Sequence, residues 1–292
     1  MSSTSLPPEP AAAASLAALR AELDGIDDTL HDLLMRRAEV VTRVGALGAK
    51  GRVALRPGRE AEIIRRLLRR HTGPLPRRAI ARIWRELLAA TTAMQGTYLV
   101  TVCETDPGNG FVQCAREHFG ALTPLHVHRS PAQAIAEVSA GTATAAVLPL
   151  PVEEDASSLA WWTALLHRDE PRIHVVARLP FWAPRSEGGP RAQALVVAAI
   201  APDASENDRS LLGLELPLEV SRARLATGLT RVGFAPGATL LRRDAGAQVA
   251  QALVEVEGFV GDADKRLADI PDLLRPAVVL GAYAIPVDGE SA

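Results

Sequence analysis

The N-terminal part of the chain carries one long series of apolar positions spaced alternately three and four residues apart. This spacing is typical of an amphipathic helix with a narrow apolar stripe along one face. The members of this stripe are Leu16, Leu19, Leu23, Ile26, Leu30, Leu33, Val40, Val44 and Leu47. The stripe is interrupted at the position between Leu33 and Val40, which is Arg37. Because a guanidinium is costly to bury without an anion, Arg37 indicates an anion-binding position.

The predicted helix, from about residue 12 to about residue 49, is longer than a small domain can cover. It spans roughly 55 Å at about 1.5 Å per residue. A domain of about 85 residues has a radius of gyration of only about 12 Å. Such a helix leaves apolar surface uncovered, and a second copy of the chain is the simplest cover. The pattern therefore predicts an intertwined homodimer whose first helices pair antiparallel.

Two shorter helices follow in the pattern. Pro57 precedes the segment REAEIIRRLLRR, whose apolar pairs fall at helical spacing, and HTGPLP ends it. A third helix is predicted from about residue 77 to 94, with the inner stripe Ile80, Ile83, Trp84, Leu87, Leu88 and Thr91. Gln95, four residues after Thr91, extends this stripe. We expect an all-α, three-helix domain over residues 15–96, preceded by a disordered tail of Ser, Pro and Ala over residues 1–14.

The periodicity changes at Tyr98, and two further domains are predicted. Over residues 97–205, short apolar runs alternate with helical segments, which indicates an α/β domain with parallel strand pairing. Over residues 206–292, the order β-α-β-β-α-β favours an α+β ferredoxin-like domain. Its second helix is expected at residues 263–276. The fold class is thus multidomain: all-α, then α/β, then α+β.

Charge is distributed unevenly along the 292 residues. Residues 11–97 contain 16 Lys or Arg against 9 Asp or Glu, and residues 98–292 contain 16 against 24. A basic N-terminal domain suits either nucleic acid or a small polyanionic metabolite. The basic residues are spread around the helices and no helix-turn-helix spacing is present, so we expect no nucleic-acid partner.

The remaining composition concerns location and cofactors. Cys103 and Cys114 form neither a disulfide framework nor a metal-ligand spacing, which predicts a reducing, cytoplasmic environment. The N-terminus has no basic and apolar segments of signal-peptide type, and no apolar run reaches 18 residues. We therefore expect no membrane partner and no bound metal.

Six side chains attached to the helical stripes form the candidate site: Arg20, Arg37, Arg59, Glu60, Thr91 and Gln95. Arg20 precedes Arg37 by 17 residues, which is about 25 Å along one helix. These two arginines cannot easily meet within one subunit, but across an antiparallel dimer they can. The alternative for Arg20 and Arg59 is an exposed position at the rim of the helices. The arginines Arg36, Arg43, Arg65, Arg66, Arg69, Arg70, Arg77 and Arg78 are taken as a solvated face.

These segments resemble the all-helical class of chorismate mutase over about residues 15–96. The likeness rests on LAALRAELDGIDDTLHDLLMRRAEVVTRVG, RPGREAEIIRRLL and IWRELLAATTAMQ. It implies a dimer with two active sites that rearranges chorismate to prephenate without a cofactor. By the resemblance, Arg37 and Arg59 bind substrate carboxylates, and Arg20 is lent by the partner subunit. Glu60 resembles the acid that forms a hydrogen bond with the substrate hydroxyl, Gln95 resembles the donor to the ether oxygen, and Thr91 takes the place of a small hydroxyl residue.

The rest of the chain is similar to prephenate dehydratase followed by a regulatory ACT domain, on AREHFG, SPAQAIAEVSAGTATAAVLPLP and VVLGAYAIPV. Residues 98–205 are too few for both lobes of a dehydratase. Ala192, Gln193 and Ala194 stand where that family has a Thr-Arg-Phe motif, so we expect dehydratase activity to be absent. Two alternatives stay open: a bifunctional mutase and dehydratase, and a non-catalytic metabolite-binding regulator.

One departure from the mutase pattern generates a prediction. Gly48 stands where the family has a lysine that donates to the ether oxygen. Gly48→Lys should raise turnover tenfold or more at saturating chorismate, because one such donor contributes about 2–4 kcal/mol. Unchanged turnover in Gly48→Lys, together with lost turnover in Lys50→Ala, would instead identify Lys50 as the donor.

Overall fold

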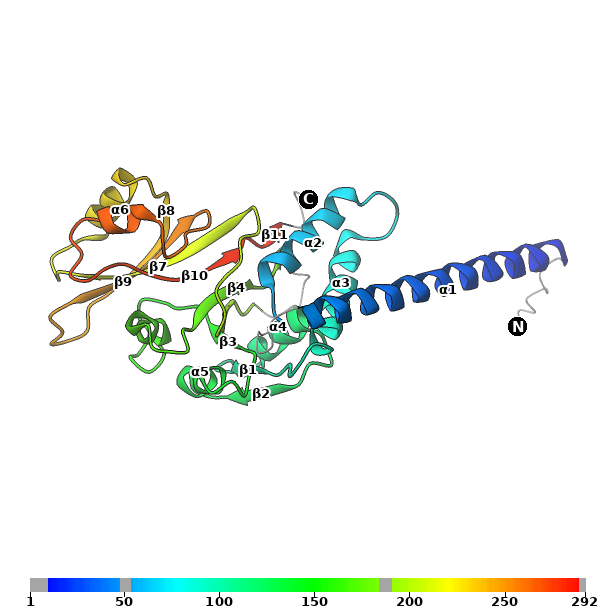
Figure 1. Cartoon of the computed structure of the whole chain (residues 1–292), viewed down its shortest axis with the longest axis horizontal. Coiled ribbons are helices and arrows are strands. Elements are labelled where there is room, and N and C mark those ends of the chain that lie inside the picture. The colour runs from blue at the N-terminus through cyan, green and yellow to red at the C-terminus, as the bar shows by residue number, and fades with distance from the viewer. Residues whose placement is uncertain (1–9, 48–53, 184–190, 289–292) are drawn as a thin grey trace, which may run out of the picture. The chain divides into compact units, whose positions relative to one another are not determined.

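The computed structural model describes residues 10–47, 54–183 and 191–288 (Figure 1). Gly48 and Lys50 lie outside the described residues. The chain divides into two units, Met1–Arg52 and Val53–Ala292. The helices, the following α/β segment and the final α+β segment occur in the predicted order, which confirms the fold class.

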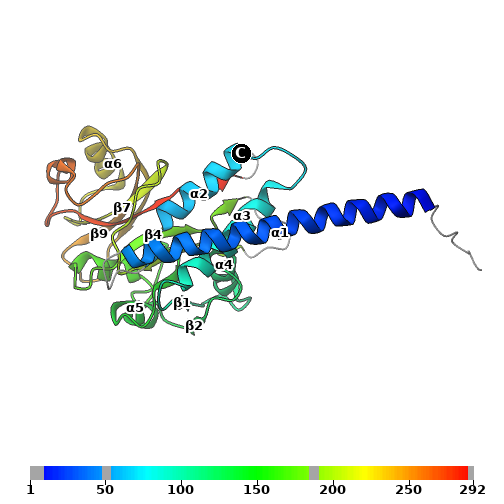
Figure 2. The same cartoon turned by 45° about the vertical axis from the view of Figure 1, so that its right-hand side comes forward.

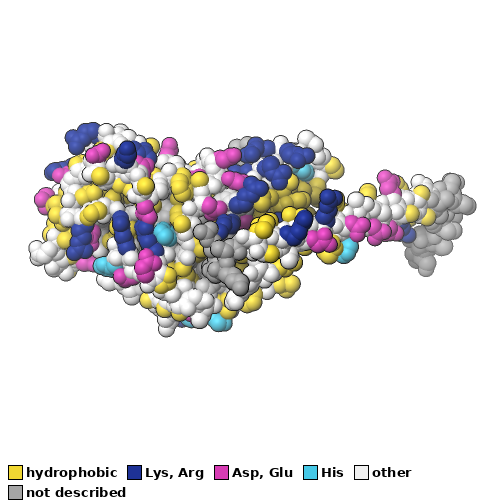
Figure 3. Space-filling view, viewed as in Figure 1, with side chains coloured by type: hydrophobic (Ala, Val, Ile, Leu, Met, Phe, Trp, Pro, Cys, Tyr) yellow, Lys and Arg dark blue, Asp and Glu magenta, His cyan; other side chains and the backbone are white. Residues whose placement is uncertain are grey.

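The described residues of the first unit form one helix, α1 (Pro10–Leu47). It begins earlier than predicted, so residues 10–14 of the expected tail are helical. The apolar stripe is exposed in the single chain, and Leu19, Leu23 and Leu33 are each more than half exposed. Apolar side chains are visible along this helix in Figure 3. No helix in the described part of the chain has an apolar stretch that would cross a membrane.

The second unit begins with a helical hairpin, α2 (Pro57–Arg70) and α3 (Arg77–Ala93). Arg77 Nη1 donates to the carbonyl of Leu68 over 2.9 Å, and Arg85 Nη1 donates to Glu60 Oε2 over 3.0 Å. From the first contact to the second, the position on α3 moves forward by eight residues while that on α2 moves back by eight, so α2 and α3 run antiparallel. The two helices share a core with Phe181, Ala284 and Val287. The domain boundary at residue 97 stays a prediction.

The buried face of α3 differs from the predicted stripe. It consists of Ala81, Arg85, Leu88, Ala89, Thr91 and Thr92. Ile83, expected to be inside, is half exposed. The prediction was wrong by about one position because it followed the largest apolar side chains. The contact surface uses alanines instead, which allow the helices to approach closely.

Five strands form the first half of the sheet: β1 (Val100–Cys103), β2 (Leu125–His128), β3 (Ala145–Pro149), β4 (His174–Leu179) and β6 (Ala194–Ala198). Their order is β2-β1-β3-β6-β4. β1 pairs in parallel with β2 and β3, as predicted. β6 is antiparallel to both its neighbours, so parallel pairing throughout was wrong. The described part of the β4–β6 connection holds no helix, and a parallel return needs such a crossover.

Two helices cover opposite faces of this half-sheet, α4 (Gly110–Phe119) and α5 (Pro131–Ser139). Successive side chains of a strand point to opposite faces. Accordingly, Ala145 and Val147 of β3 lie in the cluster with α4, whereas Ala146 and Leu148 lie in the cluster with α5. Figure 2 shows both helices beside β1 and β2.

The second half of the sheet contains β7 (Asp208–Leu216), β8 (Pro236–Arg242), β9 (Ala250–Glu257) and β10 (Val278–Ala284), with α6 (Arg222–Arg231) between β7 and β8. The order is β10-β7-β9-β8, and all neighbours are antiparallel. β9 lies between the two strands that α6 connects, which is the split β-α-β arrangement of ferredoxin-like folds.

The second helix of this half was predicted too long. Residues 263–276 contain only the short 3₁₀ helix η2 (Lys265–Asp269). Pro271 disfavours helical backbone at Ile270, and Asp272 has a positive φ of 61°. A helix therefore cannot continue through this segment.

Gly281 joins the two halves into one nine-stranded sheet by pairing with Val175 of β4. Its φ is +145°, and an added Cβ would lie 2.0 Å from the carbonyl oxygen of Val175. Two short strands, β5 (Trp182–Ala183) and β11 (Val287–Asp288), pair in parallel beside the joint. Only glycine permits the close approach between the backbones of Gly281 and Val175. The 3₁₀ helix η1 (Trp161–His167) packs against β7 and β10.

Gly281→Ala should therefore lower the free energy of unfolding by about 3 kcal/mol or more, because it adds overpacking to backbone strain. Gly246→Ala is the matched control. Gly246 has a φ of +78° with nothing within 4 Å of an added Cβ, so only strain of about 1–2 kcal/mol applies. Chemical denaturation measures both variants. Equal losses would contradict the close approach.

Candidate active site

The six predicted site residues fall into two groups. Arg20 and Arg37 lie on α1, whereas Arg59, Glu60, Thr91 and Gln95 belong to the α2–α3 part of the chain. Arg20 is exposed and Arg37 is half-buried. Partial burial lowers the pKa of Arg37. That Arg20 and Arg37 form one site with the other four residues stays a prediction.

The other four residues lie toward one end of the hairpin. Arg59 and Glu60 are in the first turn of α2, and Thr91 and Gln95 are at the end of α3. Because the helices are antiparallel, the start of α2 and the end of α3 lie at the same end. The Thr91 hydroxyl donates to the carbonyl of Leu87 over 2.8 Å, and Gln95 Nε2 donates to the carbonyl of Thr91 over 3.3 Å.

Glu60 is held by Arg85, a residue that the sequence prediction missed. Arg85 Nη1 lies 3.0 Å from Glu60 Oε2, and the two side chains are only 7% and 11% exposed. Burial raises the pKa of Glu60 and lowers the pKa of Arg85, while the attraction between the two charges opposes both shifts. Arg85 also lies 4.4 Å above the ring of Phe181. The sequence signal that could have identified Arg85 as buried is its spacing, because it lies four residues after Ala81 and four before Ala89.

The N-terminus of α2 holds a carboxylate from elsewhere in the chain. Asp203 Oδ1 accepts from the backbone N–H of Gly58, and Oδ2 accepts from that of Arg59, each over 3.1 Å. An added Cβ on Gly58 would lie 2.4 Å from the carbonyl oxygen of Asp203. A helix N-terminus attracts negative charge because its N–H groups are unpaired. Asp203 occupies that position.

The side chain of Arg59 pairs with a different carboxylate. Its Nη1 contacts Glu62 over 2.8 Å, and its side chain is 63% exposed. In the single chain Arg59 is thus exposed, and its role at the substrate stays a prediction. An exposed ion pair between residues three apart contributes only about 0.3–0.5 kcal/mol, so Arg59 can turn toward a ligand at little cost. Figure 3 shows further basic side chains gathered over α2.

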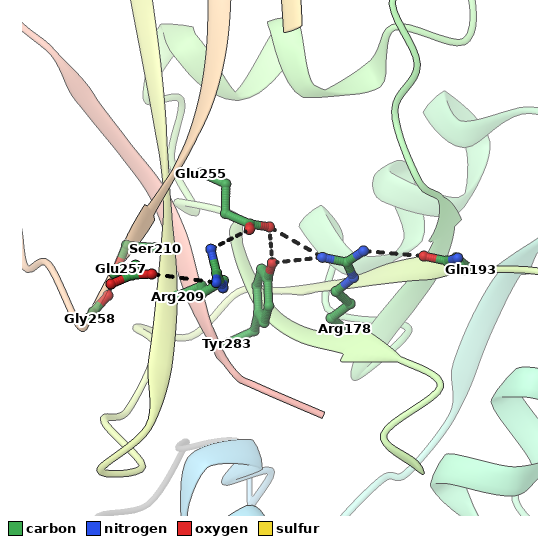
Figure 4. A network of polar contacts seen from close by, with 8 residues as sticks. All are labelled: Arg178, Gln193, Arg209, Ser210, Glu255, Glu257, Gly258 and Tyr283. Carbon is green, nitrogen blue, oxygen red and sulfur yellow. Dashed lines mark hydrogen bonds and ion pairs between the residues drawn. The ribbon is translucent and has the colours of Figure 1, made fainter. Parts of the chain in front are cut away.

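A second polar cluster spans the joint of the sheet (Figure 4). Glu255 accepts from Arg178 over 3.2 Å and from Arg209 over 2.9 Å. The Tyr283 hydroxyl also donates to Glu255, and burial raises the pKa of Tyr283. Gln193, which lies in the position compared with the dehydratase motif, accepts from Arg178 Nη2 over 3.2 Å. The carboxylate of Glu255 is thus bound by two guanidiniums and a hydroxyl, and we assign this cluster a structural role.

In the described part of the chain, no group of three His, Cys, Asp or Glu residues is placed to hold a metal ion. Cys103 and Cys114 are both buried and are not joined in a disulfide. Burial raises the pKa of Cys103 to about 11. His126 and His128 both contact Glu137, over 3.1 and 2.9 Å.

Residues 19–96 match the family model of chorismate mutase type II. Two curated relatives are both named bifunctional chorismate mutase/prephenate dehydratase. The Pseudomonas aeruginosa protein is 29% identical over 142 residues, 46% of this chain and 38% of that protein. The Neisseria gonorrhoeae protein is 34% identical over 102 residues, 35% of this chain and 27% of that protein. The matched part of the chain thus spans less than two fifths of either relative.

Two solved structures share a more distant likeness. The first is described as GqqA, a novel type of quorum quenching acylase, with 16% identity, a TM-score of 0.48, and coverage of 65% of this chain and 96% of that one. The second is a prephenate dehydratase from Streptococcus mutans, with 15% identity, a TM-score of 0.44, and coverage of 64% and 98%. At these identities and TM-scores, neither likeness supports a comparison of function.

The buried pair gives a prediction about stability. Arg85→Met should lower the free energy of unfolding at pH 7 by about 3–5 kcal/mol, because it leaves a buried carboxylate without a partner. The double variant Glu60→Gln, Arg85→Met should recover most of this loss. Chemical denaturation of the two single variants and the double variant measures the coupling between the residues.

The pH dependence follows from the raised pKa of Glu60. A carboxyl whose pKa is higher in the folded than in the unfolded state binds more protons when folded. Stability therefore falls as pH rises from about 4.5, the unfolded value, to the folded pKa. Without Arg85 this fall should become larger and extend to higher pH. A pH-independent loss in Arg85→Met would contradict the assignment to Glu60.

Proposed function

We propose that this protein is a chorismate mutase that rearranges chorismate to prephenate. The observation that carries the proposal is the family match over residues 19–96, which contains all six predicted site residues. The other support is chemical. Arginines on a helical scaffold suit a substrate with two carboxylates, and no step of the reaction needs a cofactor.

The proposed mechanism relies on positioning and electrostatics. In the rearrangement one carbon–oxygen bond breaks while one carbon–carbon bond forms, and no covalent intermediate with the protein arises. Arg37 and Arg59, with Arg20 from a second subunit, would hold the carboxylates so that the reacting carbons approach each other. Gln95 would donate to the ether oxygen as negative charge develops there.

Arg85 adds a positioning role to this scheme. Glu60 is proposed to accept a hydrogen bond from the substrate hydroxyl, and the ionised carboxylate is the stronger acceptor. Burial alone favours the protonated form, and the guanidinium of Arg85 at 3.0 Å counters it. One carboxylate oxygen, Oε2, is bound by Arg85. In our proposal the other oxygen, Oε1, meets the substrate.

The protein is further proposed to work as a homodimer in the cytoplasm. The supporting feature is the exposed apolar stripe of α1, whose members are between 41% and 88% exposed in the single chain. Pairing two such helices would bury the stripe and bring Arg20 of each to Arg37 of the other. The sequence favours a small-molecule substrate over nucleic acid or a membrane as the partner.

Dehydratase activity is expected to be absent. The position compared with the family's catalytic threonine is Ala192, which has no hydroxyl, and Gln193 is bound to Arg178. A phenylpyruvate readout on the same sample tests this. Phenylpyruvate formed from prephenate would favour the bifunctional alternative.

A chorismate-disappearance assay on the purified chain tests the mutase proposal. The wild-type protein should consume chorismate, and Arg37→Ala should reduce kcat/KM by about 100-fold or more, since a charge-assisted contact to a bound carboxylate is lost. Arg36→Ala, an exposed neighbour on the same helix, is the matched control and should retain activity. No turnover in the wild type would refute the proposal.

Mixed dimers test the shared site. Arg20→Ala and Arg37→Ala chains, each inactive alone, should recover about a quarter of wild-type activity after refolding together, because half of the dimers regain one intact site. Arg37→Ala mixed with Arg59→Ala should recover nothing, since both residues are assigned to the same subunit's site. Recovery in both mixtures, or in neither, would contradict the arrangement.

A further inference from the structure

A cavity of about 150 Å³ lies between α3, α4 and the segment 180–182 of the second unit. Each helix contributes one face at the i, i+3, i+4, i+7 spacing. From α3 come Arg78, Ala81, Arg82 and Arg85, and from α4 and the following loop come Cys114, Glu117, His118 and Ala121. The cavity contains none of the six residues assigned to the mutase site.

His118, one of the residues that line this cavity, has a buried polar atom without a hydrogen-bond partner. Its side chain is 7% exposed, and its Nδ1 is buried without a hydrogen-bond partner. Burial and the nearby charge of Arg85 hold the pKa of His118 well below its usual range, so the ring is neutral. A buried polar atom without a partner costs free energy, and such atoms in native proteins call for an explanation. A ligand that bonds Nδ1 would provide one.

The charged groups around the cavity favour an anion. Arg78 and Arg82 are exposed, and neither has an ion-pair partner within the described ranges. Arg116 donates to the carbonyls of Ala121 and Thr123, and Arg85 is paired with Glu60. The two carboxylates in the lining are also engaged: Glu86 accepts from the backbone N–H of Ala121 over 3.1 Å, and Glu117 has a partner.

The remaining lining is apolar. Ala81, Pro180, Phe181 and Trp182 form that part of the wall. Phosphate or another small inorganic anion would leave these side chains without contact. A ligand that carries both a carboxylate and a compact apolar body matches the whole lining.

We propose that this cavity binds a small organic carboxylate, with the carboxylate at Arg78 and Arg82, the apolar body against Phe181 and Trp182, and a hydrogen bond to His118 Nδ1. An inorganic anion is the alternative that the test must separate. The site draws on α3, from the helical part of the chain, and on α4, from the α/β part.

Arg85 connects this cavity to the proposed active site. Arg85 binds Glu60 and is also among the residues that line the cavity. A negative charge held at Arg78 and Arg82 would act on Arg85 as well, so occupancy should change how firmly Glu60 is held. This coupling rests on the proposed function, whereas the binding itself does not.

Isothermal titration of the full-length protein with benzoate tests the binding. Benzoate should bind, and benzyl alcohol and inorganic phosphate should bind at least about tenfold more weakly, because each lacks half of the recognised features. Arg78→Gln and Arg82→Gln should each weaken benzoate binding about tenfold or more. Arg70→Gln, an exposed arginine at the end of α2 and outside the cavity, should bind as the wild type does.

Three results would overturn the binding proposal: no benzoate binding, binding that both arginine variants leave unchanged, or phosphate binding as tight as benzoate. His118→Leu should also weaken binding. If that variant does not fold, the exposed Arg78 and Arg82 variants still decide the matter.

Turnover of chorismate with and without benzoate tests the coupling. A change in kcat that Arg82→Gln abolishes would support it. Unchanged kcat at benzoate saturation would refute the coupling alone. Absence of turnover without benzoate would refute the proposed function and leave the binding result standing.

Discussion

The helical hairpin, and the candidate site on it, depend on the buried ion pair between Glu60 and Arg85. It joins α2 to α3 inside a core, with Phe181 beneath the guanidinium and the buried Tyr98 nearby. Both charges have left water, so either one alone would be strongly unfavourable. The pair fixes the register of the helical hairpin, as the matching contact between Arg77 and Leu68 shows. It also holds in place the carboxylate that we assign to the substrate hydroxyl.

The sequence predicted the elements of this fold better than their buried faces. Periodicity located α1, α2 and α3 because helices repeat every 3.6 residues whatever they pack against. It placed the inner face of α3 about one position away from the observed one: Ile83 is exposed and Arg85 is buried, while Leu88 and Thr91 are buried as predicted. A burial pattern that places alanines and an arginine inside cannot be recognised from hydrophobicity alone. It depends on Glu60, which lies 25 residues earlier in the chain.

Strand direction shows the same limit. The pattern of apolar runs found the strands, and the β7–β10 order follows the predicted β-α-β-β-α-β arrangement except for the shortened second helix. The antiparallel direction of β6 depends on a connection without a helix in its described part, and Gly281 joins the two halves by an approach of backbones. The contacts of Asp203 and Arg85 likewise join residues far apart in sequence, so the candidate site was predicted only in its local members.

Asp203 shows how the α/β part of the chain acts on the helical part. Its carboxylate accepts from the N–H groups of Gly58 and Arg59, and it contributes to the raised pKa of Glu60. A substrate carboxylate at the start of α2 would meet this negative charge as well as the guanidinium of Arg59. The C-terminal part therefore sets the electrostatics of the first turn of α2, where two of the assigned catalytic residues lie. Asp203 lies in the connection between β6 and β7, so two hydrogen bonds tie the start of α2 to the segment that follows the first half of the sheet.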